Sequence, residues 1–182
     1  MQSIRFGLAA CLVVVPWLVA CNPAQNWRDV ALEGTAFKVQ LPCQPDRTTR
    51  PVDMGPVSLT LQVAGCESGG AMLAFMTAEL PAGADAPSLM TGWQKATLQN
   101  ARVDTRATPI HQQVWHRAGQ LPLVSSVRIQ AQGQNAAGQE VMLDAVWGAV
   151  PAGDRIRLVH AVVYAPRTSP EMANTFFDGL RP

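Results

Sequence analysis

The sequence predicts an α+β fold in which an antiparallel β-sheet is packed by two amphipathic helices. Three observations lead to this prediction. Runs in which apolar and polar residues alternate, as they do in half-buried strands, recur from residue 37 onward. Several consecutive runs are joined by short turns, which favours antiparallel pairing. Two other segments repeat their apolar residues with helical spacing, and the sheet is the surface that can bury their apolar faces.

Four segments precede the first predicted helix. Residues 37–41 alternate in polarity and are followed by prolines, so they predict a short strand. Residues 47–56 are expected to form a loop. Residues 57–64 show the clearest alternation in the chain. Residues 71–78 are apolar on both faces and therefore predict a central strand.

The first helix is expected to open at Ser88, just after a proline, with Leu89 and Trp93 on its apolar side. The sequence that follows this helix is less regular. We expect one or two short edge strands in it, near residues 102–106 and near residues 113–116.

The last third of the chain is regular again. Residues 127–132, 141–147 and 155–164 predict three strands that are joined by turns. Ser169 is expected to cap a final helix, which has a proline at its first position. The apolar face of this helix is formed by residues four positions apart: Met172, Phe176 and Leu180.

The N-terminal residues have the three parts of a secretory signal. A basic start that ends at Arg5 leads into an apolar run over residues 6–19, and a small residue then precedes Cys21. The segment Leu18-Val19-Ala20-Cys21 resembles the lipobox of bacterial lipoproteins. This resemblance implies that a signal helix is cleaved off and that lipid is attached to the sulfur of Cys21.

The lipobox resemblance divides the chain into a signal peptide (1–20), a lipidated tether (21–34) and one globular α+β domain (35–182). It implies that the domain is anchored in the cell envelope and faces the periplasm. Asn22 follows the lipidated cysteine. Because an Asp at this position retains enteric lipoproteins in the inner membrane, the resemblance favours the outer membrane.

Two alternatives to this signal can be weighed. Leu8-Ala9-Ala10-Cys11 also fits the lipobox pattern, but cleavage there would leave an apolar run that is too short for a signal. A retained transmembrane helix would need about 20 apolar residues. The apolar run here is shorter and contains Pro16.

Two cysteines, Cys43 and Cys66, belong to the predicted domain. The envelope that the lipobox implies is oxidising, so we expect a disulfide between them. If the strands at 37–41 and 57–64 pair antiparallel, the two cysteines lie at opposite ends of that pair. The bond then requires the intervening loop to fold back or the two strands to be offset. A C-x-x-C motif is absent from the sequence, which argues against a redox site.

The order of strands, helix, strands and helix over residues 35–180 resembles the PsbP-like α/β/α sandwich of thylakoid and bacterial periplasmic proteins. The segments FKVQLP at 37–42 and NTFFDGL at 174–180 are similar to segments of uncharacterised bacterial envelope proteins. The resemblance implies a sandwich fold and an accessory role in assembly, and it carries no catalytic residue.

Few side chains suggest chemistry. His111 and His116 are five positions apart, which separates them on a strand or on a helix, so no metal site is expected. His160 shares a strand face with apolar residues, and it is interpreted as a hydrogen-bonded core residue or, alternatively, as a base in a pocket. No nucleophile motif surrounds the candidate serines Ser68, Ser125 and Ser126. We therefore expect no catalytic residue and no cofactor.

The charges argue against a nucleic-acid partner. Removal of the signal lowers Lys plus Arg from 14 to 13, which equals the 13 Asp plus Glu, and a neutral balance does not attract phosphate backbones. Arg155 and Arg157 share a strand face near Arg128, where they could bind an anion or simply be solvated. Asp144 is expected on an exposed strand face.

Two functions are compatible with the sequence. The first is a non-enzymatic envelope lipoprotein that is held at the membrane by its lipid and docks on another envelope protein. The alternative is a binder of a small apolar ligand or lipid, held between the sheet and the helices. Methionines could line such a pocket flexibly or simply fill the core; they are Met54, Met72, Met76, Met90 and Met142.

Overall fold

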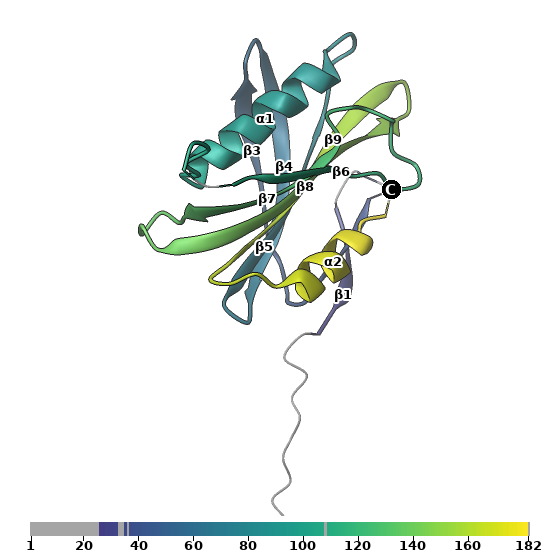
Figure 1. The fold of residues 1–182 in the computed structure, drawn as a ribbon. Coiled ribbons are helices and arrows are strands. Elements are labelled where there is room, and N and C mark those ends of the chain that lie inside the picture. The colour runs from purple at the N-terminus through teal and green to yellow at the C-terminus, as the bar shows by residue number, and fades with distance from the viewer. Residues whose placement is uncertain (1–25, 33–34, 36, 108, 182) are drawn as a thin grey trace, which may run out of the picture.

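The computed structural model describes residues 26–32, 35, 37–107 and 109–181. Among these residues it contains a seven-stranded sheet, a two-stranded sheet and two α-helices, and all strand pairs are antiparallel (Figure 1). The predicted α+β class, with an antiparallel sheet packed by two helices, is therefore confirmed. Neither helix is long and apolar enough to cross a membrane, as far as the described residues go. The predicted signal and Cys21 lie outside the described residues.

The large sheet has the strand order β3-β4-β5-β9-β8-β7-β6. Each strand pairs mainly with its neighbours in sequence, except where β5 pairs with β9 and so joins the first group of strands to the last. The strands are β3 (Asp46–Met54), β4 (Val57–Ser68), β5 (Ala71–Glu79), β6 (His111–Val114), β7 (Val127–Gln134), β8 (Glu140–Ala152) and β9 (Arg155–Ala165).

The two helices lie on opposite faces of the large sheet (Figure 1). Helix α1 (Ala86–Asn100) covers one face and contacts β8, β9 and β3. Helix α2 (Pro170–Asp178) lies on the other face, where it contacts β2 of the small sheet. Two separate groups of buried apolar side chains fill the space on the two faces. The molecule therefore has three layers, with the large sheet in the middle.

The small sheet pairs β1 (Arg28–Ala31) with β2 (Lys38–Leu41). Strand β1 falls within the segment that was predicted to be a tether. Its sequence is short and buries one side chain, that of Val30, so it gives little alternation to detect. Trp27, just before β1, packs against the core. Strand β2 also forms a bridge from Lys38 to Arg181 near the end of the chain.

The first helix begins slightly earlier than predicted. Asp85 is its N-cap, and the carboxylate of Asp85 accepts hydrogen bonds from the backbone N–H and the hydroxyl of Ser88. Aspartate is a strong N-cap because it satisfies N–H groups that have no partner within the helix. At α2, Ser169 occupies the N-cap position as predicted, but its side chain makes no capping hydrogen bond.

Two predictions between the regular segments were wrong. Residues 47–56 were expected to be a loop, but most of them belong to β3. Strand β3 is an edge strand with mostly exposed side chains, so it has no buried face to produce alternation. The edge also accommodates Pro51, which has no backbone N–H to donate to a neighbouring strand. Near residues 102–106 the chain turns, and the second expected edge strand is β6.

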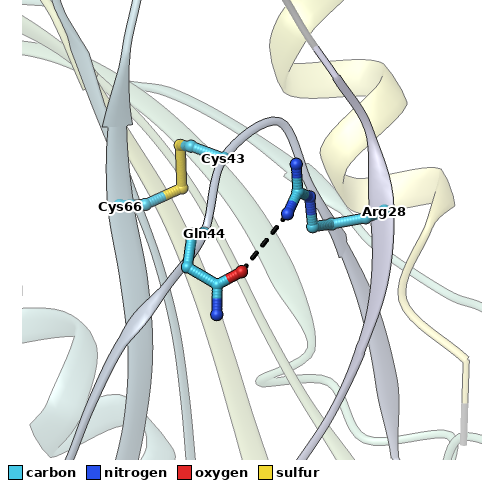
Figure 2. The surroundings of a disulfide bond; sticks show 4 residues. All are labelled: Arg28, Cys43, Gln44 and Cys66. Carbon is cyan, nitrogen blue, oxygen red and sulfur yellow. Dashed lines mark hydrogen bonds between the residues drawn. A yellow bond between two sulfur atoms is a disulfide. The ribbon is translucent and has the colours of Figure 1, made fainter.

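A disulfide joins Cys43 to Cys66, with their Cα atoms 6.0 Å apart (Figure 2). The expected bond is confirmed, and the question of register is resolved. Strand β2 does not pair with β4, because the two strands belong to different sheets. Strand β4 also continues through Cys66, beyond the predicted end of its run. The bond thus ties the segment that follows β2 to the large sheet.

A hydrogen bond near the disulfide ties the start of β1 to the same segment. The guanidinium of Arg28 donates to the side-chain oxygen of Gln44 over 3.2 Å (Figure 2). The disulfide thus links this segment to β4, and the hydrogen bond links the same segment to β1.

Candidate ligand-binding cavity

A cavity of about 900 Å³ lies between α1 and the half of the sheet formed by β3, β4, β5 and β9. Most of its lining is apolar. The sheet contributes Val52, Met54, Val57, Leu61, Val63, Met72, Ala74, Met76 and Val162, and the helix contributes Leu89, Gly92, Trp93 and Ala96. Polar groups are few and lie at distinct places: His160, Thr97 and Tyr164 within the cavity, and Arg50, Asp53, Asp85, Ser88 and Asn100 among the other lining residues.

The floor of the cavity follows from the register of β5 and β9. Met76 pairs with His160, Ala74 with Val162, and Met72 with Tyr164. Side chains two positions apart on a strand share a face, so these three pairs all face α1. The middle pair is small and its two flanking pairs are large. The floor is therefore hollow at its centre.

The helix also contributes small residues to the cavity lining. Gly92 and Ala96 both line the cavity from α1, and a Cβ atom added at Gly92 would meet no heavy atom within 4 Å. Glycine within a helix costs about 1 kcal/mol relative to alanine. Small residues on both walls thus leave a space that neither wall fills.

His160 is the most deeply buried polar residue of the cavity lining. Its side chain is 1% exposed, whereas Met72, near Tyr164 on the floor, is 42% exposed. The imidazole is stacked on Trp147 with 4.4 Å between ring centroids. The ring of Trp93 contacts it edge-on at 5.2 Å. The cavity therefore runs from a buried histidine to a solvent-accessible mouth.

The hydrogen bonds of His160 define the roles of its two ring nitrogens. Nδ1 lies 3.0 Å from the backbone oxygen of Val146. A carbonyl only accepts, so Nδ1 carries the proton and donates. Burial lowers the pKa of His160 to about 4, which keeps the ring neutral near pH 7. Nε2 is then an acceptor, and it lies 3.5 Å from the hydroxyl oxygen of Thr97 on α1.

Two further polar residues of the cavity have perturbed pKa values. Burial raises the pKa of the Tyr164 hydroxyl, so this group remains a neutral phenol. At the start of α1, the hydrogen bonds from the side chain and then the backbone of Ser88 lower the pKa of Asp85. The lining thus contains a carboxylate at the start of α1, while His160 and Tyr164 are uncharged.

Three of the five candidate methionines line the cavity: Met54, Met72 and Met76. Met90 is instead buried in the core beside α1. Met142 lines a smaller hollow near the start of α2. The expectation that methionines could line a pocket therefore holds for those on β3 and β5, and the core-filling alternative holds for Met90.

The interpretation of His160 as a hydrogen-bonded core residue is confirmed, while its role as a base stays a prediction. It is a buried, hydrogen-bonded histidine, and it also lines the cavity. His111 lies in the exposed strand β6, and His116 is exposed just beyond that strand. Within the described residues, no group of three or more His, Cys, Asp or Glu side chains could hold a metal ion.

The other polar candidates do not form a second site. Arg155 and Arg157 both form ion pairs with Glu79, so the two arginines already share one carboxylate. Asp144 was expected on an exposed strand face, and this expectation was wrong. Its carboxylate forms a largely buried pair with Arg128. Its strand face is covered by α2. In the described part of the chain, the cavity lining includes none of the candidate serines Ser68, Ser125 and Ser126.

The comparisons with known proteins identify no relative of established function. No family model matches the sequence, and no curated protein matches it. A solved structure with similarity is that of PA94 from Pseudomonas aeruginosa, a protein of unknown function that is described as a candidate regulator. It is 14% identical, the alignment covers 81% of this chain and 86% of that chain, and the TM-score is 0.32. A likeness of this degree identifies neither a fold family nor a function.

Proposed function

We propose that this domain is a non-catalytic binder of a small, largely apolar ligand, held in the cavity beneath α1. The observation that carries the proposal is the cavity itself. Its volume of about 900 Å³ lies in the range of small-molecule sites, which are mostly apolar and contain a few placed polar groups. A packed core would have few voids larger than a water molecule.

The methionines of the floor and wall support an apolar occupant. Met54, Met72 and Met76 present flexible thioether side chains to the cavity, and methionine adapts its shape to different apolar partners. The charged residues Arg50 and Asp53 come from β3, which is largely exposed. An apolar body can therefore be buried while a polar end remains near these charged residues of β3.

A protein-docking role receives less support from the surface. In the described residues, three larger apolar side chains are strongly exposed: Met72, Val114 and Val124. The first of these lines the cavity. Single exposed apolar residues are common on soluble proteins and do not by themselves indicate an interface. Docking on another envelope protein therefore remains the second proposal.

The proposed location is the cell envelope, with lipid on Cys21 and the domain facing the periplasm. The lipobox resemblance is one support for it. The other is the disulfide between Cys43 and Cys66, because such bonds persist in oxidising compartments and are rare in the cytosol. The cleavable signal helix and the outer membrane as the anchoring membrane are parts of the same proposal.

A PsbP-like arrangement belongs to the proposal as well. Its support is that two helices lie on opposite faces of a mostly antiparallel sheet. Folds of one kind host many functions, so this resemblance says nothing about the ligand.

Thermal unfolding of the full chain in lipid nanodiscs, with and without a panel of fatty acids, fatty alcohols and other apolar metabolites, tests the binding proposal. A ligand at 100 times its dissociation constant should stabilise the protein by about 2.7 kcal/mol. Gly92→Leu should abolish the shift, because the new side chain enters the cavity without a backbone clash. Lys95→Leu, on the exposed side of the same helix, is the matched control. Equal responses from wild type and Gly92→Leu across the panel would contradict the proposal.

The proposed location is tested by the intact mass of protein extracted from membranes, measured with and without reductant. We expect the mass of residues 21–182 plus acyl chains, which rises by two protons on reduction. A full-length mass without acyl groups would refute the anchor and leave ligand binding untouched.

A further inference from the structure

We propose that the cavity selects an uncharged, largely apolar molecule that carries a hydroxyl group, and that this hydroxyl binds between Nε2 of His160 and the hydroxyl of Thr97. The inference rests on the proposed function and names the chemical class of the ligand. Its basis is the position of two buried polar groups of the cavity, the acceptor Nε2 of His160 and the hydroxyl of Thr97.

The histidine ring has a fixed orientation. Nδ1 is committed to the carbonyl of Val146 at 3.0 Å. The ring is also stacked on Trp147, with 6° between the two ring planes, and Trp93 contacts it in a T-shaped arrangement. Nε2 therefore presents its lone pair toward α1, from which Thr97 lines the cavity.

The spacing between Nε2 of His160 and the hydroxyl of Thr97 leaves room for a better partner. Nε2 and the Thr97 hydroxyl oxygen are 3.5 Å apart, whereas a good hydrogen bond between an oxygen donor and a nitrogen or oxygen acceptor is roughly 2.7–3.0 Å long. The pair is thus weakly bonded. A third polar atom within reach of both could donate to Nε2 and accept from Thr97 at better distances.

A ligand hydroxyl is the group that satisfies both His160 and Thr97. A hydroxyl can donate and accept at once. An ether oxygen only accepts, so it would leave the Nε2 acceptor unsatisfied. An ionised carboxylate also only accepts, and its charge would be buried beside a neutral ring, where burial without a counter-charge is costly. The arrangement therefore favours an alcohol over an ether or a fatty acid.

The cavity also has room for the rest of the ligand. His160 and Tyr164 both line the cavity and are four residues apart on β9, which corresponds to about 13 Å along a strand. Between them the floor is formed by Ala74 and Val162. An extended apolar chain can lie along this hollow, with its hydroxyl at His160 and its other end toward the mouth at Met72.

The test compares three probes of matched chain length: decanol, methyl nonyl ether and decanoate. Each is titrated into the full chain in lipid nanodiscs, and binding is followed by the fluorescence of the tryptophans, because Trp93 and Trp147 flank His160. We expect decanol to bind about tenfold more tightly than the ether, the effect of one net hydrogen bond. Decanoate should bind no better than the ether.

Two variants separate the hydrogen bond from general apolar affinity. Thr97→Val keeps the shape of the side chain but removes its hydroxyl, and His160→Phe keeps a flat ring for Trp147 but removes the acceptor. Both should reduce the preference for decanol over the ether to less than about threefold. Because the same two probes are compared in every variant, their partition into the lipid cancels. Should His160→Phe fail to fold, Thr97→Val still decides the question.

The outcomes are distinguishable. A preference for decanol that is lost in Thr97→Val supports the inference. Equal binding of decanol and the ether, tighter binding of decanoate, or a preference that survives in Thr97→Val overturns the inference and leaves the apolar cavity as a binding site. If no probe distinguishes wild type from Gly92→Leu, these probes do not enter the cavity, and both the inference and the proposed function fail.

Discussion

The imidazole of His160 lies parallel to the indole of Trp147, with 4.4 Å between ring centroids and 6° between their planes. The two residues are direct partners in the ladder between β8 and β9, so their contact follows from strand register. A polar ring is thereby placed among aromatic and apolar side chains, where its charged form is disfavoured.

This placement predicts that the protein loses stability as the pH falls. The pKa of His160 is lowered from 6.5 to about 4 in the folded protein. Between these values the unfolded state binds more protons, so the free energy of unfolding decreases as the pH drops through this window. The decrease attributable to His160 should reach about 3 kcal/mol. Above the upper value its contribution does not change with pH.

Urea unfolding at about pH 7 and about pH 4.5 measures this dependence. His160→Gln cannot titrate but can still donate to the Val146 carbonyl, so it should lose part of the difference between the two conditions. His111→Gln, in an exposed strand, should keep it. An equal pH dependence in all three proteins would show that the destabilisation arises from other groups.

A second prediction concerns the helix wall of the cavity. Gly92→Ala should raise the free energy of unfolding by up to about 1 kcal/mol, because alanine favours the helix and its Cβ meets no neighbour. Gly138→Ala should instead lower it, since Gly138 has a φ of 78° that disfavours other residues. Chemical denaturation of both variants in parallel checks the sign. A loss of stability in Gly92→Ala would mean that the wall is closer to the sheet than described.

The disulfide provides a third prediction. Cys43 and Cys66 are 23 positions apart, and closing a loop of this size stabilises a protein by roughly 3 kcal/mol through the entropy of the unfolded chain. The double variant Cys43→Ser/Cys66→Ser should lose about this much stability. Its urea midpoint should also be insensitive to reductant, whereas that of wild type should fall on reduction. If wild type were equally insensitive, the bond would not form in solution.

The pair of Arg128 and Asp144 provides a fourth prediction. The guanidinium makes two hydrogen bonds to the carboxylate, and the two side chains are 14% and 13% exposed. Arg128 also contacts Asn174 and Phe177 of α2. Asp144→Ala leaves a largely buried cation without its partner and should cost about 3 kcal/mol.

The exposed ion pair between Arg155 and Glu79 is the matched control. Arg155→Ala should change the free energy of unfolding by less than about 1 kcal/mol, because exposed pairs contribute little. Similar losses in the two variants would indicate that burial does not distinguish the pairs.

Much of the fold could be predicted from the sequence, and the parts that were missed share a physical reason. Strands that bury one face, such as β4, reveal themselves by alternation. Strand β3 has mostly exposed side chains, and β1 is four residues long, so neither gives a periodic pattern. Their pairing partners stabilise them, and these partners are not evident from local sequence.

The cavity could be foreseen only in part. The methionines indicated flexible apolar surfaces, and strand parity placed His160 on an apolar face. The cavity is lined by Ala74 and Val162, which meet across a strand pair, and by Gly92 of α1. Such a coincidence of small residues is set by register and helix position, so it appears only in three dimensions. The tautomer of His160 likewise depends on a carbonyl of the neighbouring strand.

The bridge between Lys38 and Arg181 also constrains when the domain can fold. The two residues exchange backbone hydrogen bonds, each N–H donating to the other's oxygen, although they stand near opposite ends of the domain. Long-range contacts of this kind form late, because the whole intervening chain must be ordered first. Strands β1 and β2 can therefore pair as soon as both are available, whereas the bridge that joins β2 to the end of the domain must wait for residue 181.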